Sequence, residues 1–226
     1  MSIRTAAPHE SETRIVVRPL GNPLPLGFLA LMVATAAVAM LQLGVLEPDQ
    51  GHVVALGLLV LTVPLQAIAS VLGFLARDPV AGTGMGVLAG TWAAVGFTML
   101  GSPPGATSPA LGVLLLGSAV AMIVPTAAAT AKLAGLAVMG LSSVRFAVTG
   151  VGQFTGSSEW LTAAGWVGVA LAVVAAYAAL AFELEDAHRA TVLPVGRRGP
   201  GADTMTAPLR DELTSLAHEG GVRKQL

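Results

Sequence analysis

Six long apolar runs determine what this chain can fold into. They cover residues 25–45, 53–76, 84–100, 111–130, 133–153 and 161–183. Runs of about 17–25 apolar residues are long enough to cross the roughly 30 Å hydrocarbon core of a bilayer as α-helices. Backbone polar groups in lipid must be bonded within the protein, and none of the runs alternates as a barrel strand does. The sequence therefore predicts an all-α integral membrane protein whose six transmembrane helices form a compact bundle.

The amino-acid composition excludes an ordinary soluble domain. Hydrophobic residues make up 54% of the chain and charged residues only 11%, with a mean hydropathy of +0.76. Soluble domains carry about 25% charged residues. A soluble fold of this composition would need a core larger than 226 residues can enclose. The chain contains no cysteine, which excludes disulfides and thiolate chemistry.

Charge is distributed asymmetrically between the two sides that six crossings define. Eleven of the twelve Lys and Arg residues lie on the side of the termini, and the opposite side carries only the acidic residues Glu47, Asp49 and Glu159. Because Lys and Arg in short loops are retained in the cytoplasm, we expect both termini there and a multi-pass protein of the inner or plasma membrane.

The same pattern divides the chain into three parts. Residues 1–21 form a cytoplasmic N-terminal segment, and residues 22–187 form the six-helix transmembrane domain. Residues 188–226 form a cytoplasmic tail that is expected to be largely disordered, because it contains Gly, Pro and charged residues but no long apolar run.

A distinctive motif precedes the first run. Residues 22–28 read Asn-Pro-Leu-Pro-Leu-Gly-Phe, which resembles the Asn-Pro-x-Pro-Leu-Gly-Leu signature of the acetate uptake transporter family, to which the bacterial succinate-acetate permeases belong. The matching signature positions are Asn22, Pro23, Pro25, Leu26 and Gly27. Gly-Trp-Val-Gly at 165–168 and Thr-Val-Leu-Pro-Val-Gly at 191–196 are similar to the family's last helix and closing motif.

The resemblance covers about residues 20–196 and implies a six-helix subunit, often in a homohexameric ring. It also implies a carboxylate pathway through each subunit, with acetate or succinate as the cargo. The second helix departs from the family pattern. Where relatives carry Gly-Gly-x-Ala-Gln-x-x-Ala-Gly, this chain reads Leu-Gln-Ala-Ile-Ala-Ser-Val-Leu-Gly at 65–73. This departure bears on the cargo and not on the fold.

Asn22 has two interpretations. Proline fixes its own φ and biases the preceding residue away from helix, so residues 22–25 are expected to form a stiff, extended lead into the first helix that Asn22 can cap. Alternatively, Asn22 and the free amides after Pro25 form a polar cradle for anions at the cytoplasmic mouth.

Arg145 is the one basic residue inside an apolar run. A charge there costs about 2.5–3.5 kcal/mol by insertion scales, so it should face a wet cavity or a partner. It is the best fixed positive charge for drawing a carboxylate inward, and Ser142 lies one turn away on the same face. The alternatives are that Arg145 snorkels to the interface or packs between subunits.

A polar row is expected on the second helix. Gln66 and Ser70 are four residues apart, and Thr62 extends their row by another turn. Pro64 lies within the row and frees a carbonyl one turn earlier. We interpret this row as a polar stripe beside the pathway, with bonding to a neighbouring helix as the alternative. On the third helix, glycines at 82, 84, 86 and 90 predict close packing.

A conduit for a small carboxylate also needs narrow apolar points. By alignment with the family's hydrophobic constriction, Leu31, Thr91 or its neighbour Trp92, and Leu141 occupy the corresponding places. Thr35 follows Leu31 by one turn and adds a hydroxyl to the same face. Ordinary helix packing explains such residues equally well.

No catalytic or metal constellation is recognisable, so we expect neither an enzyme nor a cofactor nor nucleic-acid binding. The four histidines are widely separated and outside the runs. Glu183, Glu185 and Asp186 are expected to form a solvated helix end, with a proton relay as the alternative.

The expected function is transport of a small monocarboxylate, with acetate first and succinate second, by a channel or by proton symport. Two alternatives stay open. One is a channel for neutral solutes such as ammonia or acetic acid, and the other is a structural or signalling protein that has kept the scaffold without the pathway. A wet cavity that reaches Arg145 would favour the anion.

Overall fold

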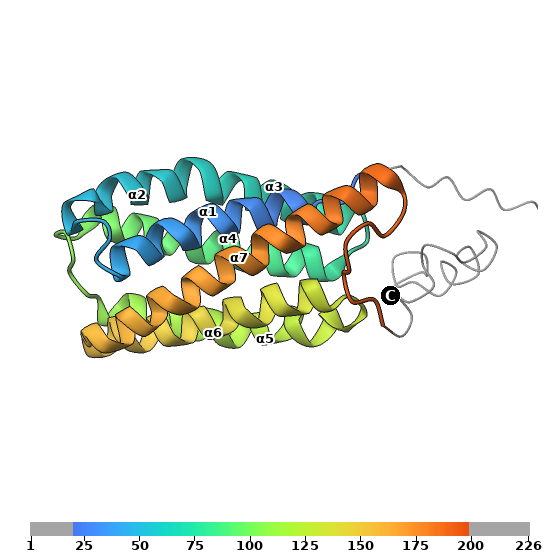
Figure 1. Cartoon of the computed structure of the whole chain (residues 1–226). Coiled ribbons are helices and arrows are strands. Elements are labelled where there is room, and N and C mark those ends of the chain that lie inside the picture. The colour runs from blue at the N-terminus through green and yellow to red at the C-terminus, as the bar shows by residue number, and fades with distance from the viewer. Residues whose placement is uncertain (1–19, 199–226) are drawn as a thin grey trace, which may run out of the picture.

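The computed structural model describes residues 20–198, and within them the regular elements are helices aligned along one common axis (Figure 1). Six helical spans are long and apolar enough to cross a membrane, which confirms the predicted fold class. They are α1 (Leu24–Gln42), a composite second span, α4 (Pro79–Gly101), α5 (Pro109–Ala128) followed by the short 3₁₀-helix η3 (Ala129–Ala131), α6 (Leu133–Thr155) and α7 (Ser158–His188).

Short polar residues and prolines start these helices. The side chains of Asp78, Ser108 and Ser157 accept hydrogen bonds from the amides of the first turns of α4, α5 and α7, which would otherwise be unsatisfied. Pro79 and Pro109 occupy first-turn positions, where no amide donor is needed. These residues therefore determine where α4, α5 and α7 begin.

The second span is not one continuous α-helix. It consists of the 3₁₀-helix η1 (Pro48–Gln50), α2 (Gly51–Gly57), the π-helical segment η2 (Leu58–Thr62) and α3 (Val63–Leu75). Pro64 follows the π turn directly and cannot donate to the carbonyl four residues earlier, with which its ring would also clash. The wider π turn accommodates that proline.

Helix boundaries differ from the predicted runs by a few residues. The largest differences are five residues. The second span begins at Pro48 instead of residue 53, α4 begins at Pro79 instead of residue 84, and α7 extends to His188 instead of residue 183. At 31 residues, α7 is about 46 Å long, against a hydrocarbon core of about 30 Å. Its last turns therefore project beyond the expected membrane thickness.

The spans pack as a closed ring. Close contacts join α1 to α7, α7 to α6, α6 to α5, α5 to α4, α4 to α3 and α3 to α1. One continuous cluster of buried apolar side chains fills the ring, from Leu111 and Val95 near one end to Phe28 and Phe182 near the other. Residues 20–22 and 189–198 lie at the Phe182 end, which we call the termini end (Figure 1).

The chain folds back after α7. Within the part of the sequence assigned to the tail, residues 191–198 form a segment that we call the strap. Val195 on the strap is 1% exposed, and the Tyr177 hydroxyl donates to the Pro194 carbonyl at 2.8 Å. An isolated antiparallel bridge pairs Lys132 with Arg197. Residues 199–226 of the predicted tail and the first 19 residues lie outside the described residues.

Candidate functional site

A cavity of about 270 Å³ opens at the end of the bundle opposite the termini. We call it the vestibule. Every span contributes to its walls, because the C-terminal ends of α1, α4 and α6 and the N-terminal ends of the second span, α5 and α7 meet there. The volume is slightly below the range of about 300–1,000 Å³ that is typical of ligand pockets, so it suits a small solute.

The vestibule wall is mainly apolar but carries several hydroxyl and amide groups, and it is almost entirely uncharged. Among the described residues, no carboxylate, Lys or Arg lines it, and His52 is the single titratable side chain. Hydroxyl and amide groups supply the remaining polarity, from Gln42, Thr98, Ser102, Thr107, Thr149, Gln153, Ser158 and Thr162. Such groups can solvate a small polar solute without holding it by a fixed charge.

Two of these side chains also brace the loops around the vestibule. Gln153 Oε1 accepts a hydrogen bond from the Ser108 amide at 2.9 Å, which ties the start of α5 to the end of α6. The His52 ring lies 3.3 Å from the Ser102 carbonyl, across from the end of α4. The wall is thus held by contacts between elements that are distant in the sequence.

The floor of the vestibule is apolar. Val38, Val95 and Leu115 both line the cavity and belong to the buried core. Trp92 and Phe146 lie one helical turn deeper on α4 and α6, with their rings in an edge-to-face contact at 5.9 Å and an interplanar angle of 69°. Trp92 is 2% exposed, and its Nε1 is buried without a hydrogen-bond partner. This conformation is therefore closed between the vestibule and the termini end.

Arg145 lies beside this floor, inside the bundle. Its side chain is only 1% exposed, so it does not snorkel to the surface of the described subunit. Nη1 donates to the carbonyl of Ala164 on α7, whereas Nη2 is buried without a partner. Thr149, which lines the vestibule, is one turn nearer to the opening and donates to the Arg145 carbonyl at 2.7 Å. The vestibule comes within one turn of Arg145 without reaching it.

Glycine makes room for the guanidinium. A Cβ atom added at Gly168 would lie 2.8 Å from Arg145 Cζ and 3.0 Å from the Ala39 Cβ atom. Arg145 therefore crosses the inner surface of α7 toward α1. The Thr35 hydroxyl donates to the Gly168 carbonyl at 3.5 Å from the α1 side. Residues 35, 145, 164 and 168 together form one buried polar layer below the vestibule.

The predicted stripe on the second span is buried and bonded to neighbouring backbones. Thr62 donates to the Ala30 carbonyl at 3.3 Å, and Gln66 Nε2 lies 3.5 Å from the Gly27 carbonyl. Ser70 donates to the Gly82 carbonyl at 2.6 Å. None of the three lines the vestibule. Gln66 Oε1 is buried without a partner, and a role for the stripe beside a pathway stays a prediction.

The other predicted pathway residues also lie in the core. Leu31 is fully buried, and Leu141 is half-buried and packs against the core. Thr91 donates to the Val87 carbonyl and contacts the Ser118 hydroxyl at 2.9 Å. Ser142 bonds to a carbonyl of its own helix and does not contact Arg145 by a hydrogen bond. Their roles as a constriction or as ligands stay predictions.

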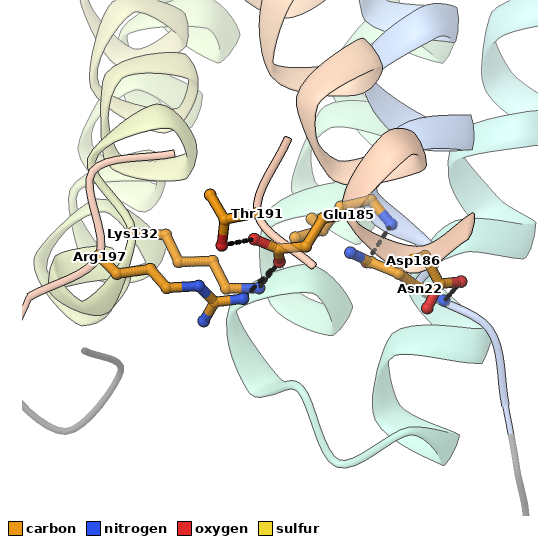
Figure 2. Close-up of polar contacts among 7 residues, drawn as sticks. Asn22, Lys132, Glu185, Asp186, Thr191 and Arg197 are labelled. Carbon is orange, nitrogen blue, oxygen red and sulfur yellow. Dashed lines mark hydrogen bonds and ion pairs between the residues drawn. The ribbon is translucent and has the colours of Figure 1, made fainter. Parts of the chain in front are cut away.

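The first motif contacts the last turns of α7 at the termini end. The backbone amide nitrogen of Asn22 donates to Asp186 Oδ2 on α7 at 3.4 Å (Figure 2). The side-chain Oδ1 of Asn22 accepts a hydrogen bond from the backbone amide of Leu24 at 3.0 Å. The expected extended lead is wrong at Pro23, whose dihedrals are helical (φ −79°, ψ −14°). Helical bonding already begins there, because the Gly27 amide donates to the Pro23 carbonyl. Asn22 thus braces the helix start.

Gly27, the glycine of the first motif, allows close helix packing. A Cβ atom added there would collide with Met85 on α4 and would lie 3.3 Å from the Ala69 Cβ atom on α3. The motif therefore lets α1 approach two neighbouring helices at once.

Most residues of the vestibule wall were not predicted from the sequence. Thr149 stands out as a polar residue inside an apolar run, but Gln42, Thr98, Gln153 and Thr162 fall near helix ends, where polar residues are ordinary. A usable signal was that Gln42 and Gln153 lie near the ends of two runs on the same side.

Comparison with known proteins assigns the chain to a family. The sequence profile of the GPR1/FUN34/yaaH family matches residues 5–196. The chain belongs to this family. No curated protein gives a significant sequence match. Among solved structures, the bacterial acetate channel SatP is similar, with a TM-score of 0.71 and 21% sequence identity over 79% of this chain and 100% of the SatP chain. This GPR1/FUN34/yaaH member therefore shares the fold of SatP.

Proposed function

We propose that this protein is a membrane transporter or channel for small monocarboxylates, with acetate as the first candidate and succinate as the second. The observation that carries the proposal is the uncharged vestibule, whose hydroxyl and amide groups lead to within one helical turn of Arg145. Family membership supports it, as does the shared fold with a protein described as an acetate channel. By the family resemblance, the working form is a homo-oligomer, and a hexamer is the specific expectation.

The site has the chemistry that carboxylate passage needs. Hydroxyl and amide donors replace part of the hydration of a carboxylate, and without a fixed charge in the wall the anion can leave again. Arg145 provides attraction from below, in the low-dielectric core where one charge acts over several ångströms. The apolar floor with Trp92 and Phe146 then limits leakage while the conformation is closed.

A second candidate is passage of a neutral solute, such as undissociated acetic acid. Among the described residues, no charged side chain lines the vestibule wall, the floor beneath it is apolar, and the vestibule does not reach Arg145. These three observations favour the neutral solute. The two candidates differ in their need for Arg145, because only an anion gains from its charge.

Site-directed labelling tests the vestibule, and the absence of cysteine makes it specific. Thr162→Cys places a thiol in the vestibule wall, and Thr155→Cys places one at the same end of the bundle on an exposed residue outside the wall. A bulky methanethiosulfonate should block acetate flux through Thr162→Cys and leave flux through Thr155→Cys unchanged. Equal flux through both labelled proteins would contradict a route through the vestibule.

A further inference from the structure

A second group of charged side chains lies at the termini end, outside the site described above. Glu185 on α7 is only 6% exposed. Its Oε1 is shared by Arg197 Nη2 and by Lys132 Nζ, the latter at 3.8 Å. Its Oε2 accepts from the Thr191 hydroxyl at 3.3 Å (Figure 2). The expected solvated helix end is therefore right for the exposed Glu183 and wrong for Glu185.

The group caps the interior of the bundle. Lys132 Nζ lies 5.0 Å from the centroid of the Phe182 ring, and the centroids of Phe182 and Phe28 are 6.0 Å apart. Both phenylalanines are fully buried. A solute that left the apolar core at this end would meet these charged groups next.

Glu185 also holds three elements together. Lys132 stands between η3 and α6, whereas Thr191 and Arg197 belong to the strap. The strap is bonded beside the start of α6, where the Leu133 amide donates to the Gly196 carbonyl at 3.1 Å. One carboxylate thus joins α7, the strap and the start of α6 (Figure 2).

The charges of Lys132 and Arg197 favour an anion between them. Burial lowers the pKa of Lys132, and the nearby charge of Arg197 lowers it further, while Glu185, Asp78 and Asp186 raise it to a lesser extent. Two cations held close together in a partly buried place repel each other unless a carboxylate lies between them. In this conformation the chain itself supplies that carboxylate.

We propose that Lys132, Arg197 and Thr191 form a binding site for a small carboxylate, which the chain's own Glu185 occupies in the closed conformation. Acetate presents the same two oxygen atoms as the end of a glutamate side chain. The inference rests on the proposed function, because a carboxylate arriving from the core would compete with Glu185 and release α7 from the strap. The inner end would thus open in response to its own cargo.

Chemical rescue tests the site directly. Glu185→Ala removes the internal carboxylate and leaves its three donors, so added acetate should refill the space. At acetate ten times its Kd, the Tm of the full-length variant in detergent should rise by about 3–6 °C over the same concentration of chloride. Glu183→Ala alters an exposed carboxylate two residues away. For this variant and for wild type, the Tm in acetate should not exceed the Tm in chloride by a comparable amount. Glu185→Ala/Arg197→Gln should lose the rescue.

The outcomes distinguish a carboxylate-binding site from a purely structural ion pair. Equal Tm values for Glu185→Ala in acetate and chloride would overturn the proposal. If the variant cannot be purified in chloride, recovery of folded protein in acetate supports the site, and failure in both salts counts against it.

A second variant keeps the side-chain volume. Glu185→Gln leaves a neutral amide as the internal competitor, which lacks the charge-assisted contact of the carboxylate. The acetate concentration that half-saturates transport from the termini side should therefore fall roughly tenfold or more. An unchanged half-saturating concentration would overturn the competition between acetate and residue 185.

Thermal rescue of Glu185→Ala without any wild-type acetate flux would refute the proposed function and leave this site standing. Wild-type flux without thermal rescue would refute the site alone.

Discussion

Arg145 shows how a single residue can be anticipated in part. Its position inside an apolar run marks it as unusual, and helical periodicity places Thr149 on the same face one turn nearer the vestibule. Its bond to the Ala164 carbonyl could not be anticipated, because that bond depends on how closely α7 approaches. The approach in turn requires Gly168, where any Cβ atom would displace the guanidinium.

At this scale the charge of Arg145 can be tested alone. Arg145→Gln should lower acetate flux per folded oligomer by roughly 10- to 100-fold, because a charge-assisted hydrogen bond is worth about 1.5–3 kcal/mol. Arg145→Lys should recover part of the flux, since it restores the charge but not the planar donor geometry. Flux in proteoliposomes is normalised to intact oligomer. Equal flux in all three proteins would remove Arg145 from the pathway and favour the neutral solute.

At the scale of elements, small residues decide which helices touch. The sequence predicts close packing on α4, and the structure shows it at Gly82, Gly84 and Gly86, whereas Gly90 faces open space. The most extensive helix contact, between α5 and α6, was not anticipated. A Cβ atom at Gly112 would lie 2.7 Å from the Phe154 amide nitrogen and 2.8 Å from the Gly150 carbonyl oxygen. Periodicity identifies a helix face but not its partner.

The α5–α6 contact predicts a difference between two glycines of one helix. Gly112→Ala should destabilise the protein by about 1–3 kcal/mol, because the added methyl group meets backbone atoms that cannot rotate away. Gly117→Ala, with nothing within 4 Å of the added atom, should be neutral or slightly stabilising. Thermal unfolding in detergent measures both. Similar Tm values for the two variants would mean that α5 and α6 are not packed as described.

At the scale of the whole molecule, the apolar runs predict the six spans and their order. The vestibule could not be predicted in this way, because it arises where six helix ends meet, and its wall combines residues as distant as His52 and Thr162. The strap escaped prediction for a related reason: it has no apolar run and is fixed by Glu185, a charged residue that is buried only in the folded bundle.

Orientation follows from the charges at the two ends. Within residues 20–198, the basic residues outside the spans lie at the termini end, whereas Glu47, Asp49 and Glu159 lie around the vestibule end. We expect the termini end to face the cytoplasm. A tag at either terminus should resist protease added to intact cells, and a tag in the loop at 103–106 should be cleaved. The reverse pattern would place the vestibule inside.

Uptake of labelled acetate into proteoliposomes, with and without an imposed proton gradient, tests the central claim most directly. Protein-free liposomes measure the acetic acid that crosses lipid unaided. Thr149→Trp, which fills the vestibule from its wall, provides a control with a blocked route, and its fold is checked by its elution as intact protein. We predict saturable uptake by wild type above both controls, and a dependence on the gradient would identify proton coupling. Wild-type uptake equal to that of protein-free liposomes under both conditions would contradict the account and leave a membrane scaffold without a carboxylate pathway.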